Sequence, residues 1–194
     1  SDGNANFEIK DGSLSINSTS SGFVSIVHDP WRPVQSDGGH LGQNPGLFDR
    51  SQIDKRLDIA VFQTHYLKEN IHLSGIPTLY TAVTTDQESF DICVALSLIR
   101  EEEEIINQFT TGFLRIQKAM KDIETNYIIN LHPTNISITK GSKLRLSLSA
   151  SSWPAIGVNP GHNKVRCGNS SIDHKITTLN FNLKKSIMKI NPFF

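Results

Sequence analysis

The chain lacks the features that mark several large classes of protein. Its 194 residues contain only two cysteines, Cys93 and Cys167. Two cysteines so far apart make neither a disulfide framework nor a zinc-ligand pair, so we predict free thiols and a reducing, cytoplasmic location. No apolar run approaches the roughly 20 residues that a membrane-spanning helix needs, and the N-terminus shows no signal-peptide pattern. We therefore expect no membrane partner.

An excess of charge of one sign is also missing. The 19 basic and 19 acidic residues cancel, which removes the electrostatic footprint of a nucleic-acid-binding protein. Gly38 and Gly39 are followed by His40-Leu41-Gly42, which does not open a helix as a phosphate-binding loop would. The sequence therefore predicts no nucleic-acid partner and no cofactor.

Catalytic and metal-binding motifs are absent as well. The nucleophile turn of α/β serine hydrolases, G-x-S-x-G, does not occur. The seven histidines are scattered, without an H-x-H or H-E-x-x-H spacing that would bring imidazoles together on a metal ion. We predict no catalytic residue and no metal site in this chain, and no motif supports a small self-sufficient enzyme.

What the sequence does contain is alternation with a period of two. Apolar residues occupy every second position over residues 90–98 and again over 144–150, as in strands with one face in a core. Spacings near ten residues, with Gly, Pro, Asn and Asp between the runs, predict one all-β domain over residues 1–194, an antiparallel β-sandwich. The residues predicted to face inward are Ile92, Val94, Leu96, Leu144, Leu146 and Leu148. The other predicted strands are Phe23–Val27, Leu57–Thr64, Ile71–Ser74, Thr78–Thr85, Phe109–Gln117, Tyr127–Leu131, Ile136–Thr139 and Ile176–Phe181.

Segments between the predicted strands are expected to form other structures. The four consecutive acidic residues Glu101–Glu104 would repel one another if buried, so we predict an exposed hairpin tip. The segments Ile105–Gln108 and Lys118–Ile123 are alternative places for a short helix.

Several motifs occur in a fixed order along the chain. The stretch Val27–Gly75 reads V-H-D-P-W-R-P-V, then G-G-H-L-G, then F-D-R-S-Q-I-D-K-R-L-D, and ends in I-H-L-S-G. Later come T-G-F-L-R at Thr111–Arg115 and K-G-x-x-L-R-L-x-L-S-A-S-S-W-P at Lys140–Pro154. This order resembles the C-terminal domain of X-prolyl dipeptidyl-peptidases and of their cocaine-esterase-like and cephalosporin-acylase-like serine hydrolase relatives. The resemblance implies a jelly roll of the galactose-binding-like type.

The same resemblance implies a function. In that family the Ser-Asp-His triad lies in a preceding α/β-hydrolase domain, so this chain is expected to be a non-catalytic domain. It would brace that partner domain, shape substrate access and assist subunit association in a possible homo-oligomer. The alternative is an autonomous carbohydrate-binding module, which shares the fold. The acidic turn Arg100–Glu104 and the basic end Lys184–Phe194 depart from the family pattern.

One long loop is predicted to make the contact with the missing domain. Residues 28–53 are rich in Pro, Gly and Asp, and loops of this length are commonly functional or packed on a neighbour. Trp31 and Phe48, flanked by Arg32 and Arg50, supply the aromatic and arginine anchors typical of interfaces. Trp153 is instead predicted to plug one end of the sandwich core.

Overall fold

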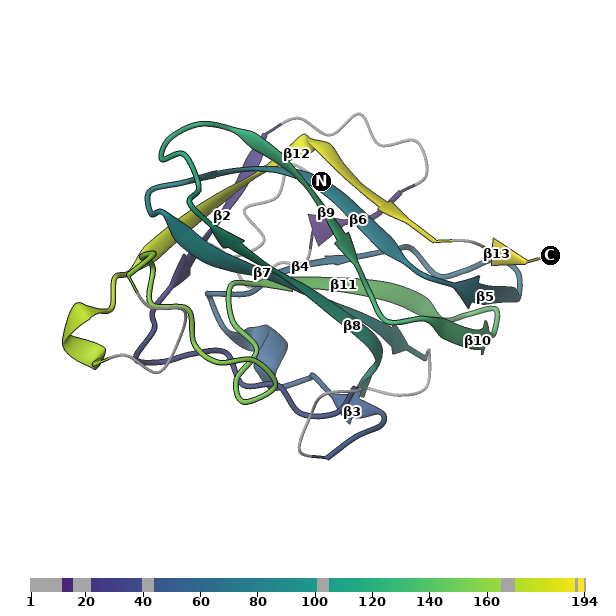
Figure 1. The fold of residues 1–194 in the computed structure, drawn as a ribbon. Coiled ribbons are helices and arrows are strands. Elements are labelled where there is room, and N and C mark those ends of the chain that lie inside the picture. The colour runs from purple at the N-terminus through teal and green to yellow at the C-terminus, as the bar shows by residue number, and fades with distance from the viewer. Residues whose placement is uncertain are drawn as a thin grey trace.

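The fold is built almost entirely from strands (Figure 1). The computed structural model describes residues 12–15, 22–39, 44–100, 105–164, 170–190 and 192–193, so the predicted hairpin tip at 101–104 and Cys167 lie outside the described residues. The strands are β1 (Gly12–Ser13), β2 (Phe23–His28), β3 (Phe48–Asp49), β4 (Ala60–Gln63), β5 (Ile71–Gly75), β6 (Thr78–Thr85), β7 (Ser89–Ile99), β8 (Ile106–Gln117), β9 (Thr125–Asn130), β10 (Thr134–Ile138), β11 (Lys143–Ser149), β12 (Thr177–Lys189) and β13 (Pro192–Phe193). Two 3₁₀ turns, η1 (Ile53–Lys55) and η2 (Ser171–Asp173), interrupt the loops.

Two main sheets face each other. One has six strands in the order β1-β4-β11-β7-β8-β3, and the other has four in the order β2-β12-β6-β9. The pairs are antiparallel except β1 with β4, and a smaller sheet, β10-β5-β13, lies at one end (Figure 1). The predicted antiparallel β-sandwich is therefore confirmed, while the narrower galactose-binding-like type stays a prediction.

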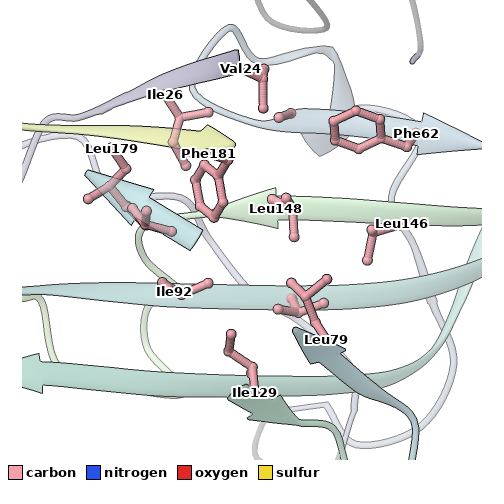
Figure 2. Packing of buried hydrophobic residues seen from close by; sticks show 14 of the residues in the cluster. Val24, Ile26, Phe62, Leu79, Ile92, Ile129, Leu146, Leu148, Leu179 and Phe181 are labelled. Carbon is pink, nitrogen blue, oxygen red and sulfur yellow. The ribbon is translucent and has the colours of Figure 1, made fainter. Parts of the chain in front are cut away.

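The hydrophobic core fills the space between the two main sheets. Phe181 and Leu179 of β12 meet Ile92 of β7 and Leu148 of β11 there (Figure 2). All six residues predicted to face inward are buried, which confirms the alternation. A second apolar cluster, Leu73, Leu98, Ile138 and Leu144, joins the small sheet to the end of the six-stranded sheet.

The local predictions between strands are partly wrong. Residues 106–108 begin β8 rather than a helix, because Gln108 and Asn107 continue the pairing with β7. Residues 118–123 form turns in which Lys118 and Asp122 adopt φ of 58°, a left-handed conformation that ends any helix. The strand predicted at Ile176–Phe181 continues to Lys189 through an irregularity between Asn182 and Ile187.

Gly112 lies where β8 passes the end of β9. A Cβ atom at this position would lie 2.5 Å from the carbonyl oxygen of Asn130 and 2.7 Å from Cα of Leu131, and both obstacles are backbone atoms. We expect Gly112→Ala to lower the free energy of unfolding by about 1–3 kcal/mol, because the two segments must move apart. Urea unfolding measures this loss. Asn126→Ala, at an exposed position of β9, is the control, and equal midpoints for the two variants would contradict the prediction.

Candidate docking face

Residues 29–39 and 44–59 lie against the outer face and one edge of the six-stranded sheet, and we call them together the loop layer. Val34 and Ile59 of the loop layer pack on Val61 of β4, on the side of the strand away from the sandwich core. The backbone N–H of Ser36 donates to the carbonyl oxygen of Trp153 at 2.8 Å, which fastens the layer to the loop after β11. The outer face of the sheet is therefore covered along β4, β7 and β11.

This cover explains why β7 is buried on both faces. Asp91, Cys93, Ala95 and Ser97 alternate with the core residues of the strand, yet each of them is buried. The sequence predicted strands with only one buried face, and that part of the prediction is wrong. Sheets that are covered on both faces usually carry apolar residues on both. The outer face of β7 nevertheless carries the polar residues Asp91 and Ser97.

A buried ionic network ties the loop layer to the sheet. Asp54 of η1 accepts from Arg50 Nε at its Oδ1 (2.9 Å) and from Arg145 Nε at its Oδ2 (2.8 Å). Ser147 Oγ also donates to Oδ2 at 2.8 Å, and Arg50 Nη1 donates to Gln108 Oε1 at 2.8 Å. The three charged side chains are almost fully buried. Charge-assisted bonds of this kind are strong and directional, so the network fixes the position of the layer.

A second polar cluster holds the loop after β11. Asp91 of β7 accepts two bonds from Arg115 of β8, at 2.8 and 2.7 Å, and one from Asn159 Nδ2 at 2.9 Å. Arg115 also donates to the carbonyl oxygen of Gly157. The segment that carries Trp153 is thus fixed at both ends, since Trp153 itself bonds to residues 34–36.

His28 ends β2 beside this cluster and is buried. Burial lowers the pKa of its imidazole below the ordinary 6.5, although a hydrogen bond with the backbone of Asn159 and the nearby carboxylates of Asp91, Asp58 and Asp29 act in the opposite direction. Its Nε2 atom has no hydrogen-bond partner. His28 is therefore held in its neutral form.

This arrangement predicts a loss of stability in mild acid. The unfolded chain takes up a proton at His28 near pH 6.5 while the folded chain resists it, so the unfolded state binds more protons below that pH. The free energy of unfolding should be unaffected by His28 above about pH 6.5 and should fall as the pH drops below it. Urea unfolding at intervals from pH 7.5 to 5 measures the slope, and His28→Gln should flatten it. An equal slope in the variant would show that other groups are responsible.

Exposed aromatic residues lie on the loop layer and next to it. Trp31 is 52% exposed and its ring centroid lies 5.9 Å from that of His174. Trp153 is 45% exposed, so the prediction that it plugs the sandwich core is wrong. Its backbone pairs with the loop layer, and this leaves the indole outside the core. Phe113 of β8 is exposed as well, whereas the neighbouring Gly112 is buried.

The predicted contact residues therefore have different environments. Trp31 and Arg32 are exposed, and the carbonyl oxygen of Arg32 accepts from Arg56 at 2.7 Å. Phe48 is half-buried in β3. Arg50 is buried, with its guanidinium bound to Asp54 and Gln108, and we leave it out of the contact surface. That the other three contact a partner domain stays a prediction.

Sequence reasoning did not identify Asp54, Asp91, Arg145 or Asn159 as structural centres. For Asp91 and Arg145 the available signal was a charged residue inside a strand that otherwise carries small and apolar side chains, and Asp54 and Asn159, outside the strands, gave no such signal. In the described part of the chain, no three His, Cys, Asp or Glu side chains converge to hold a metal ion. No helix in that part is long and apolar enough to span a bilayer.

Comparison with solved structures supports the fold. An aminopeptidase from a marine-sediment Thaumarchaeota archaeon superposes with a TM-score of 0.82 at 17% identity, over 95% of this chain and 36% of the other. An α-amino acid ester hydrolase gives a TM-score of 0.81 at 17% identity, over 94% of this chain and 35% of the other. A CocE/NonD family hydrolase from Staphylococcus aureus gives 0.54 at 13% identity, over 93% and 38%. This chain thus spans little more than a third of those chains.

The sequence comparison gives the family. A search among curated proteins finds no match. The family model for the C-terminal non-catalytic domain of X-Pro dipeptidyl-peptidases, however, matches residues 4–186, nearly the whole chain. This match agrees with the order of motifs in the sequence and with the sandwich of the structure. The chain belongs to the family of X-Pro dipeptidyl-peptidase C-terminal non-catalytic domains.

Proposed function

We propose that this chain is the accessory C-terminal domain of a longer serine hydrolase that cleaves X-Pro peptides or related esters and amides. In that protein it packs on a preceding α/β-hydrolase domain, which carries the Ser-His-Asp triad, and limits the shape of substrate that reaches the active site. The family match supports this function, and so does the much greater length of the hydrolases that share the fold. Self-association and a cytoplasmic location remain predictions.

The observation that carries the proposal is the exposure of two tryptophans, Trp31 in the loop layer and Trp153 in the loop that bonds to it. Exposed tryptophan is common at the centre of interfaces, where a large ring gives contact area at little cost in conformational entropy. Trp153 is held by backbone bonds to the loop layer, and the layer is fixed to the sheet by Asp54. A preorganised surface of this kind loses little freedom on docking.

The carbohydrate-binding alternative needs a flat platform of stacked rings. Among the described residues, the ring next to Trp31 is that of His174, and it is tilted by 49°. This geometry does not favour a sugar-stacking platform.

The experiment compares domain contact with domain stability. The catalytic and C-terminal parts of the longer protein are expressed separately, and their Kd is measured by calorimetry. Trp153→Ala and Trp31→Ala should each raise the Kd about fivefold or more, as expected for residues that contribute over 1 kcal/mol, and should leave the unfolding midpoint of this chain unchanged. Ile128→Ala is the matched control, because Ile128 is equally exposed but lies on β9 of the opposite sheet.

The opposite outcome is equally clear. If the tryptophan variants unfold this chain and leave the domain contact unchanged, the two residues stabilise the sandwich and the docking face lies elsewhere. The activity of the same tryptophan variants in the intact protein provides a second test. Loss of kcat/KM with an intact triad, shown by normal labelling with a serine-directed phosphonate, supports a role in shaping the active site.

A further inference from the structure

A small cavity lies between the loop layer and the outer face of the six-stranded sheet. Its volume is about 30 Å³, enough for one or two water molecules. Its walls come from the loop layer, from β7, β8 and β11, and from the loop after β11. The polar side chains among them include Arg50, Gln108, Ser147, Ser149, Ser151 and Ser152. Arg50 is the one charged residue among the described residues that line it.

The guanidinium of Arg50 is only partly neutralised. It bonds to one oxygen of Asp54, through Nε, while the other oxygen of that carboxylate accepts from Arg145 and Ser147. Its second bond, from Nη1, goes to the neutral amide of Gln108. A guanidinium carries five N–H donors, so the bonds to Asp54 and Gln108 leave donors for a ligand. A buried cation with spare donors beside a cavity attracts negative charge.

Serine hydroxyls provide further donors. Ser151 Oγ accepts from the backbone N–H of Val34 at 2.8 Å, which leaves its own proton to be donated. Ser149 Oγ donates to the carbonyl oxygen of Ser151 at 3.0 Å and so fixes this turn. The thiol of Cys93, which also lines the cavity, adds no negative charge because burial raises its pKa well above the ordinary value.

We propose that this cavity binds a small monovalent anion, held by the guanidinium of Arg50 and the hydroxyl of Ser151. The volume suits a halide or a single carboxylate group and is too small for an organic acid with a long polar chain. The anion has two possible sources: a free ion, or an acidic side chain of the preceding domain. The second source rests on the proposed function, whereas binding of a free ion to this chain does not.

The test replaces sodium gluconate with sodium chloride, bromide or formate at constant ionic strength and follows thermal unfolding of this chain. Gluconate exceeds the cavity, so the exchange changes site occupancy while the screening of surface charges stays constant. We expect a saturable rise in the unfolding midpoint of about 2–4 °C. Crystals soaked in bromide should show an anomalous peak between Arg50 and Ser151.

Two variants and one control make the test specific. Arg50→Gln should abolish the anion dependence, and Ser151→Ala should raise the Kd about tenfold, the typical loss for one hydrogen bond to a charged group. Arg56→Gln is the control, because Arg56 pairs with Asp58 in the same loop layer but does not line the cavity. If Arg50→Gln does not fold, the Kd of Ser151→Ala and the position of bromide in the crystal still test whether the anion binds between Arg50 and Ser151.

Several outcomes overturn the proposal: no anion dependence in this chain, equal dependence in Ser151→Ala, or bromide bound only elsewhere. The longer protein separates the two sources of the anion. A saturable halide effect in both proteins indicates a free ion. An effect in this chain that disappears in the longer protein indicates that an acidic side chain occupies the cavity there.

Discussion

Replacing Asp54 with asparagine is expected to lower the free energy of unfolding of this chain by about 3–5 kcal/mol. The substitution keeps the shape of the side chain but leaves the guanidiniums of Arg50 and Arg145 buried without the carboxylate that they share. Asparagine has one acceptor oxygen where aspartate has two, so its NH2 group must face either Arg50 Nε or the donors Arg145 Nε and Ser147 Oγ. Against a total stability of about 5–15 kcal/mol for a typical domain, such a loss is large. Urea unfolding at pH 7, followed by circular dichroism, measures it.

The matched control is Asp58→Asn in the same loop layer. Asp58 pairs with Arg56 at 2.7 Å, but the two side chains are 20% and 36% exposed and water screens them. A partly exposed pair contributes about 0–1 kcal/mol, so this variant should lose little. Native-state hydrogen exchange measures separately whether the loop layer loosens. The amides of Ser36 and Arg50, which bond across the edge of the layer, should exchange faster in Asp54→Asn than in the control. Equal losses in the two variants would show that the Asp54 network does not fix the layer.

The sandwich could be predicted from the sequence because its core follows local alternation. Leu144, Leu146 and Leu148 occupy every second position, and a strand places such residues on one face whatever its partners are. Strand Thr78–Thr85 was predicted with its observed bounds for the same reason. Where a strand continues through polar residues, as β12 does beyond Phe181, the pattern fades and the predicted end comes too early.

The loop layer could not be predicted in the same way. Asp54 bonds to Arg145, and 91 positions of the sequence separate them. Alternation assigned Arg145 and Asp91 to a solvent-facing side, as it must when it has no information on what covers that side. The cover comes from a segment without periodic structure, so only the folded chain shows that the second face is buried.

The same limit applies to the candidate site. The long loop and its tryptophan were recognised because Pro, Gly and aromatic residues in such a segment are unusual. Whether each anchor is free to make a contact depends on its neighbours in space. Arg50 was expected in the contact surface but is buried, with its guanidinium bound to Asp54, and Trp153 was expected in the core but is 45% exposed.

Phe181→Ala is the second substitution with a large expected effect, a loss of about 3–5 kcal/mol. The ring is fully buried, and it points from β12 toward Leu148 of the facing sheet (Figure 2). Its removal leaves a cavity that the surrounding strands cannot close, because β12 is paired on both sides, with β2 and β6. Thermal and urea unfolding measure the loss.

The control for this substitution is Phe23→Ala, in the neighbouring strand β2. Phe23 is 56% exposed and faces away from the core, so the same substitution should change the free energy of unfolding by less than about 0.5 kcal/mol. Hydrogen exchange in Phe181→Ala and Asp54→Asn also distinguishes the stability of the sandwich from that of the loop layer. Phe181→Ala weakens the contact between the sheets, so exchange should accelerate in both sheets and in the loop layer together, since the layer has no core apart from the sheet that it covers. In Asp54→Asn, the amides of the loop layer should instead exchange faster than those of the two sheets. If Phe181→Ala loosened only β12 and left the layer protected, the layer and the six-stranded sheet would form a unit that is stable without the second sheet.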